Sequence, residues 1–200
     1  MQYLAQANQH LSAAVEAYQQ AAEALRAQGD LQGADDVLAK AKACGYVEPS
    51  PVEALCKQGR FQEAAVEQQS RAKEQFGHDQ VQAYLEAARL FGLANASVRA
   101  NQCTRKAAKC AALLNEPGAA QMFRDLAVTQ HSDAADLLFK ASLCDLACDL
   151  DAEAEFANEF AHACKNRDRE TFTEAAIALD SAGRLDRWTT AMLYTIKCSF

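Results

Sequence analysis

The chain has 200 residues, half of them hydrophobic, with only 8 Gly and 3 Pro. That length can bury the core of one ordinary domain or of a short helical array. So few turn-forming residues exclude an all-β fold of many short hairpins, and the composition also excludes collagenous and disordered chains. The 27 acidic and 20 basic residues give a net charge of −7, so no nucleic-acid partner is expected.

Hydrophobic residues recur at helical spacing along almost the whole chain. A long first helix is expected to end near Gly29, with an antiparallel partner over residues 31–44. The sequence GYVEPSP at 45–51 is the clearest loop. Beyond the loop, the pattern predicts helices over residues 52–57, 61–76, 77–91, 97–114, 118–129, 133–148, 151–164, 170–182 and 184–198.

A turn pattern repeats along the chain, in which a helix-breaking residue is followed five residues later by Ala. Small Ala side chains allow two helices to approach closely, and helix pairs repeated at about 34 residues are typical of tetratricopeptide arrays. We therefore predict an all-α fold, a tetratricopeptide-like right-handed α-solenoid of antiparallel helix pairs over residues 1–165. A C-terminal helical cap over residues 166–200 would pack on it as part of a single structural unit. The copies of the turn pattern are Gly29 with Ala34, Gly59 with Ala64, Asn115 with Ala120, and Asp149 with Ala154.

The cysteines are expected to be reduced thiols on buried helix faces of a cytoplasmic protein, because no signal peptide or membrane-spanning stretch is evident. Cys144 and Cys148 lie one helical turn apart, but without a Cys-x-x-Cys pair or a spaced His pair, core packing is favoured over a zinc site. Phosphate-binding loops, nucleophile elbows and metalloprotease motifs are missing, so neither an enzyme nor a cofactor is predicted. The eight cysteines are Cys44, Cys56, Cys103, Cys110, Cys144, Cys148, Cys164 and Cys198.

Charge is distributed unevenly. Residues 133–159 contain eight acids and a single base, Lys140, so this window carries the whole net charge of the chain. The simplest interpretation of such stretches is a solvated helix face. One basic and one acidic stretch would also fit two partners of opposite charge. The basic stretch is the predicted helix 97–114, whose broad polar face carries Arg99, Arg105, Lys106 and Lys109.

The C-terminal sequence TFTEAAIALDSAGRLDRWTTAMLYTIK, residues 171–197, resembles the closing segment of the α-type soluble NSF attachment proteins (SNAPs). The matching features are Asp-Ser, Arg-Leu-Asp, Trp, Met-Leu and Ile-Lys, in that order. Two upstream segments, LLFKASLCDLACD at 137–149 and ANQCTRKAAKCAALLNEPGAA at 100–120, resemble helices of the same family. The resemblance extends over most of the chain, and its C-terminal motif is the most specific part.

This resemblance implies a non-enzymatic adaptor. Family members bind the SNARE four-helix bundle and recruit the AAA ATPase NSF, which disassembles the bundle in vesicle trafficking and membrane fusion. By position, Lys106 matches a lysine on the SNARE-facing helix, and Asp149 matches an acid that faces NSF. The expected SNARE-binding residues are Arg99, Arg105, Lys106 and Lys109, and the expected NSF-binding residues are Asp149, Asp151 and Glu153.

The chain departs from the family pattern in several places. Gln102 and Val66 stand where the family usually has SNARE-contacting lysines. We also expect no counterpart of the usual N-terminal membrane loop or of the acidic C-terminal tail, and therefore expect membrane association to be peripheral, through SNAREs. These departures leave an alternative open: a divergent tetratricopeptide-like scaffold that binds a helical partner without activating NSF, as a competitor or regulator.

Overall fold

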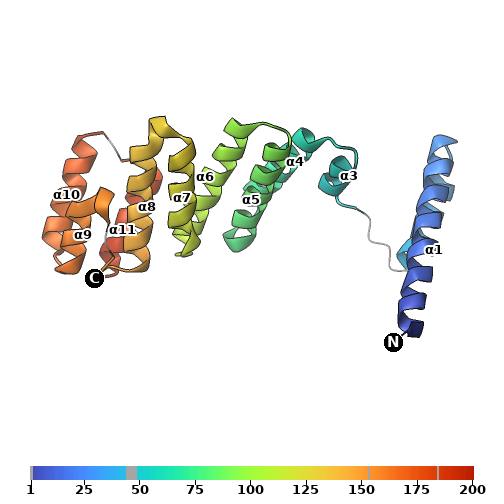
Figure 1. Cartoon of the computed structure of the whole chain (residues 1–200), viewed down its shortest axis with the longest axis horizontal. Helices are drawn as coiled ribbons and strands as arrows, with labels where there is room; N and C mark the ends of the chain where they lie inside the picture. Colours follow the sequence, from blue (N-terminus) through green and yellow to red (C-terminus); the bar gives the residue numbers. More distant parts are fainter. Residues whose placement is uncertain (1, 44–48, 153, 184) are drawn as a thin grey trace. The chain divides into compact units, whose positions relative to one another are not determined.

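A computed structural model describes residues 2–43, 49–152, 154–183 and 185–200, with side chains from residue 10 onward. These residues form helices and no strand, which confirms the all-α prediction (Figure 1). They divide into two compact units, residues 1–50 and 51–200. The predicted boundary between solenoid and cap lies inside the second unit. Of the predicted features, Cys44, Glu153, Arg184 and most of the loop 45–51 fall outside the described residues.

The first unit is a helical hairpin of α1 (Gln2–Ala27) and α2 (Leu31–Ala43). Its small core contains Ala22, Ala34 and Leu38. The first helix ends as predicted, because Gly29 adopts a left-handed backbone (φ +83°) that favours glycine.

The second unit is an array of helices in which consecutive helices from α3 through α8 pack against one another (Figure 1). Of the later helices, α11 packs back against both α6 and α8, and α10 contacts α9 and α11. Two short 3₁₀ turns, η1 (His131–Asp133) and η2 (Glu155–Ala157), precede α8 and α9. The helices are α3 (Pro51–Lys57), α4 (Phe61–Glu74), α5 (Gly77–Leu93), α6 (Ser97–Leu113), α7 (Gly118–Thr129), α8 (Ala134–Cys148), α9 (Asn158–Lys165), α10 (Arg169–Ser181) and α11 (Arg187–Cys198).

The repeated turn pattern has a physical basis in the way these helices end. At Asn115, for example, φ is +55°, and the N–H of Glu116 donates to the carbonyl of Ala111 at 3.0 Å. This left-handed ending satisfies carbonyls that the helix leaves free, and it turns the chain back sharply. All four Ala residues of the predicted pattern are buried, but the fourth copy differs from the others. Asp149 has an extended backbone (φ −145°), and Ala154 precedes η2 and lies outside the helices. The same left-handed ending also occurs at Asn95 and Arg167, which the pattern did not include.

Two predicted helices begin later than expected. The range 151–164 was wrong at its start, because residues before α9 turn back along α8 and bury Ala154 and Ala157 there. The last helix begins at Arg187 instead of residue 184, since the Asp186 side chain caps it by accepting the N–H of Thr189 at 2.7 Å.

Aromatic side chains join the later helices into one core. Phe160 of α9 contacts Phe172 of α10 with ring centroids 5.0 Å apart, and Phe172 contacts Phe200 at 5.5 Å. Elsewhere in the same core, the ring centroids of Phe123 in α7 and Trp188 in α11 lie 5.4 Å apart. The last contact holds α11 against α7, and α11 also packs against α6, the helix that carries the predicted basic residues.

Candidate functional site

The candidate site is built on α6, whose inner side is made of small residues. Cys103, Ala107 and Ala111 are fully buried, so α6 lies close to its neighbours and its four cations project from the remaining surface. The sequence predicts one broad basic face here. The structure divides it into two flanks with different surroundings.

One flank faces α5 and holds Arg99 and Lys106, which we call the open pair. The Arg99 guanidinium lies 5.8 Å from the ring centroid of Phe91, and the Lys106 Nζ lies 5.7 Å from that of Tyr84. Both cations are exposed, and within the described part of the chain neither forms an ion pair. The face of an aromatic ring attracts such a cation but carries no negative charge that would neutralise it. The open pair is therefore available to an acidic partner.

The other flank holds Arg105 and Lys109, which we call the closed pair. Arg105 donates to the Gln130 carbonyl oxygen Oε1 at 2.5 Å and to Asp133 Oδ2 at 2.8 Å. The hydrogen bond from Arg105 lowers the pKa of the Asp133 carboxyl. Lys109 Nζ donates to Asp186 Oδ2 at 3.0 Å. Both members of the closed pair are therefore engaged within the fold.

Asp186 is the centre of a polar cluster that holds α11 in place. Its carboxylate accepts hydrogen bonds from the N–H of Thr189 at 2.7 Å and from the Thr189 hydroxyl at 2.8 Å, while Lys140 Nζ lies 3.5 Å away. Partial burial opposes ionisation of Asp186, but the bonds from Thr189 and Lys109 and the charge of Lys140 outweigh it. They hold the pKa of Asp186 well below its usual range.

Trp188 adds a second link between α11 and α6. Its indole Nε1 donates to the backbone carbonyl of Lys109 at 3.0 Å, and the Lys109 Nζ lies 5.6 Å from its ring centroid. Trp188 and Asp186 belong to the most specific sequence motif, and both form hydrogen bonds that join α11 to α6. This agrees with the expectation that the C-terminal helix caps the array.

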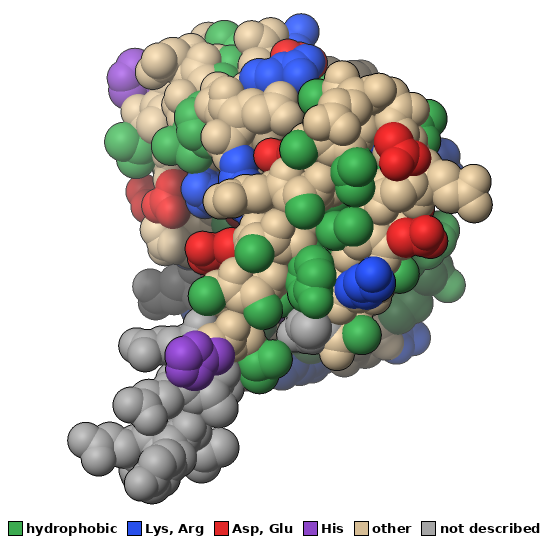
Figure 2. Space-filling view, turned by 90° about the vertical axis from the view of Figure 1, so that its right-hand side faces the viewer, with side chains coloured by type: hydrophobic (Ala, Val, Ile, Leu, Met, Phe, Trp, Pro, Cys, Tyr) green, Lys and Arg blue, Asp and Glu red, His purple; other side chains and the backbone are tan. Residues whose placement is uncertain are grey.

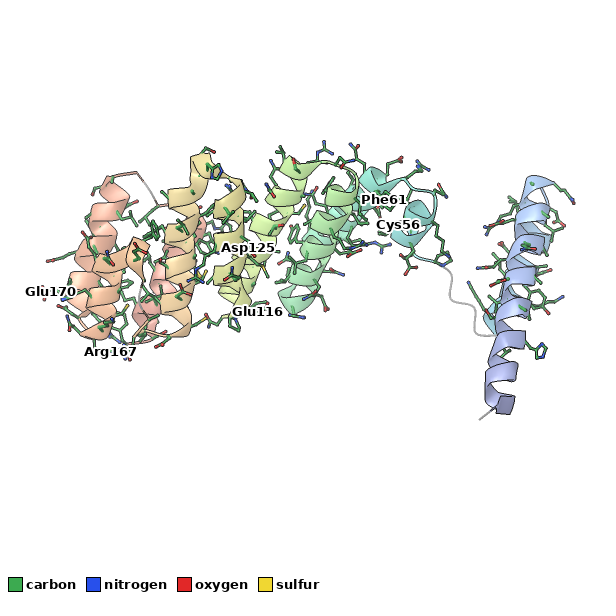
Figure 3. All side chains as sticks on the ribbon, in the orientation of Figure 1. Cys56, Phe61, Glu116, Asp125, Arg167 and Glu170 are labelled. Atoms are coloured by element: carbon green, nitrogen blue, oxygen red, sulfur yellow. The ribbon has the colours of Figure 1, made fainter. Side chains whose placement is uncertain are left out.

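The acids predicted to face NSF lie just after α8. The Asp149 carboxylate accepts the N–H of Asp151 at 3.0 Å and has no ion-pair partner among the described residues. Asp151 accepts from Arg167 at 3.2 Å, and both acids are exposed. Figure 3 shows Arg167 and Glu116 at one edge of the second unit, so the end of α8 belongs to that edge. Glu153, the third predicted acid, lies outside the described residues.

The acidic window 133–159 is not a uniform surface, because several of its acids have basic partners. Asp145 pairs with Arg124 and Asp136 with the buried Lys140, in addition to the pairs made by Asp133 and Asp151. In the described part of this window, the acids without an ion pair are Asp149, Glu155 and Glu159. Figure 2 shows a different face, on which hydrophobic, acidic and basic side chains are interspersed.

The cysteines differ in how far they are buried. Cys103, Cys144 and Cys164 are buried as predicted, but Cys148 and Cys198 are exposed, which corrects the expectation for those two. Burial raises the pKa of the Cys144 thiol to about 12 and that of Cys164 to about 11, so neither is a reactive thiolate at neutral pH.

The described residues meet neither the requirements of a metal site nor those of a membrane-spanning helix. They contain no cluster of His, Cys, Asp and Glu side chains that could hold a metal ion. Among them, too, none of the helices combines the length and the apolar character needed to cross a membrane.

Comparison with known families gives one match. The sequence model of the soluble NSF attachment proteins, SNAP, matches residues 39–152 and 149–200, which include α6, the Asp149 loop and the capping helix α11. No curated protein sequence matches the chain. Because the family match extends over well more than half of the sequence, the chain belongs to the soluble NSF attachment protein (SNAP) family.

Proposed function

We propose that the chain is a non-enzymatic adaptor that binds assembled SNARE complexes and recruits an NSF-type AAA ATPase for their disassembly. The observation that carries this proposal is the SNAP family match across both the basic helix and the capping helix. The protein would act in the cytoplasm, and would reach membranes through the SNAREs it binds.

For the SNARE contact, the exposure of the open pair supports Arg99 and Lys106 as the leading residues. Arg105 and Lys109, which the sequence also predicts as SNARE-binding, would have to leave their acidic partners in order to contact an acidic bundle. We propose that they shape the binding face by holding α11 and the start of α8, and that they contact SNAREs less directly.

For the ATPase contact, Asp149 is the leading residue, because it is exposed and its charge is not neutralised by a described cation. Asp151 shares its charge with Arg167 and would contribute less. Glu153 is proposed on its sequence position alone.

The direct experiment is ATP-driven disassembly of a preformed SNARE complex by NSF, with and without this protein. We expect acceleration when the protein is added. Failure to bind the SNARE complex at all would contradict the proposal.

A charge-reversal pair separates recruitment from binding. Asp149→Lys should weaken recruitment of the ATPase while SNARE binding is retained. The matched control is Asp125→Lys, an exposed acid on α7 that should change neither activity. Loss of both activities in Asp149→Lys would instead indicate a defect in folding.

The alternative is a scaffold that binds a SNARE-like helical partner without activating the ATPase. The closed pair favours it, because two of the four predicted SNARE-binding cations already have partners inside the fold. Under this alternative, the protein would bind the SNARE complex and slow disassembly when it competes with an active adaptor.

A further inference from the structure

A groove lies where α8 begins, α9 begins and α10 ends, and its described lining includes none of the leading contact residues Arg99, Lys106 and Asp149. It has a volume of about 1150 Å³, and its walls come from η1 and the first turn of α8, from η2 and α9, and from the last turns of α10. In Figure 1 the start of α8 and the end of α10 lie at the edge of the second unit opposite the end of α8, and α9 begins lower down between these two helices. Asp149 follows the other end of α8, about 20 Å away along the helix.

The floor of the groove is aromatic and aliphatic. Phe139 of α8 and Phe160 of α9 contact each other with ring centroids 6.3 Å apart, and Leu179 of α10 closes the third side. Phe156 of η2 also lines the groove, and 46% of its surface is exposed. A large apolar side chain left open beside an apolar floor is the kind of surface that a partner side chain covers.

The rim of the groove is acidic. Four carboxylates line it, and none of its described lining residues is basic. Asp133 and Asp136 pair with Arg105 and Lys140, which do not line the groove. The other two acids are Glu155 and Glu159, which are exposed and have no ion pair within the described residues.

We propose that this groove binds a short amphipathic helix of a partner protein that carries Lys or Arg beside large apolar side chains. Apolar side chains would cover Phe139 and Phe156, while the cations would pair with Glu155 and Glu159 at the rim. Basic side chains suit such a rim because their aliphatic stems can lie on apolar surface while their charged ends reach the carboxylates. The volume exceeds that of an ordinary small-molecule pocket, which favours a peptide segment over a metabolite.

The probe for this proposal is a labelled synthetic helical peptide of about 14 residues, about four turns, with Leu on one face and Lys on the other. The matched probe carries Glu in place of Lys. We expect the full chain to bind the Leu/Lys peptide and not the Leu/Glu peptide, and we expect binding to weaken as salt is raised. Failure of the Leu/Lys peptide to bind would overturn the proposal.

Three variants locate the binding. We expect Glu155→Lys/Glu159→Lys to weaken binding of the Leu/Lys peptide about tenfold or more, and Phe156→Ala to weaken it through loss of apolar contact. The control Glu74→Lys/Asp125→Lys makes the same charge change on exposed acids of α4 and α7 and should bind like the unaltered chain. If the control lost as much affinity for the peptide, binding would depend only on the net negative charge of the chain. That result would contradict a specific binding groove.

Hydrogen exchange on the bound complex gives an independent readout. We expect the peptide to slow exchange in residues 155–160 and 175–183, and not in α4 or α5. Ultracentrifugation of the free chain tests the competing occupant: self-association that Phe156→Ala abolishes would make a second copy the occupant and would overturn the peptide proposal.

Discussion

The two flanks of α6 carry the same kinds of side chain in different roles. On the α5 flank, Arg99 and Lys106 lie over aromatic rings and keep their charge exposed. On the opposite flank, Arg105 and Lys109 lie about one-third exposed beside Asp133 and Asp186. The basic helix α6 is therefore not one uniform surface, because the capping helix α11 docks on part of it.

The largest loss of stability is expected from removing Trp188, the side chain that joins α11 to α6 at Lys109. Trp188→Ala removes a buried ring that contacts Phe123 and an indole that bonds the Lys109 carbonyl, so we expect a loss of about 3–5 kcal/mol in the free energy of unfolding. Urea unfolding followed by circular dichroism measures it. The control is Tyr194→Ala on the exposed side of α11, which should change stability by about 0.5 kcal/mol or less. Similar values for the two variants would show that α11 is not docked through Trp188.

A matched pair of lysine variants tests the two flanks directly. Lys109→Met should lower the free energy of unfolding by about 1–2 kcal/mol, because Asp186 loses a charged hydrogen-bond partner. Lys106→Met should change it by about 0.5 kcal/mol or less, since Lys106 is exposed and has no acidic partner in the described chain. The reverse order would contradict the assignment of open and closed pairs.

The low pKa of Asp186 predicts a pH dependence with a definite sign. Because the folded state holds this pKa below its unfolded value of about 3.9, the stabilisation is fully present above that value and is lost as the pH falls through the folded pKa. Asp186→Asn should therefore be less stable than the unaltered chain at neutral pH, by about 1 kcal/mol after allowance for the partial exposure of Asp186. The difference should shrink below about pH 4. A difference that grows on acidification would show that the carboxylate is not stabilised by its partners.

The smallest effect on stability is expected for the exposed hydrogen bond between His78 and Glu116. His78 at the start of α5 bonds Glu116 after α6 at 2.9 Å, and this bond raises the pKa of His78. Glu116→Gln should lower that pKa toward its ordinary value in an NMR titration while leaving the unfolding midpoint nearly unchanged. An unchanged His78 pKa would mean that the two side chains do not pair in solution.

Most helices could be predicted from the sequence, because helical periodicity and helix-ending residues are local signals. The start of α11 could also have been found, since Asp186 three residues before Thr189 is an N-cap signal. The division of the basic face could not. Lys109 meets Asp186 across 77 positions in the chain, and Arg105 meets Asp133 across 28. Only packing of α11 and the α7–α8 turn against α6 decides which cations stay exposed.

The sharpest test of this division is the affinity for a preassembled SNARE complex, measured for Arg99→Gln/Lys106→Gln against the unaltered chain at low and physiological salt. We expect the double variant to keep its unfolding midpoint, to bind about tenfold more weakly, and to show a smaller salt dependence. Unchanged affinity in this folded variant would contradict the role of the open pair, and would move SNARE recognition to another surface.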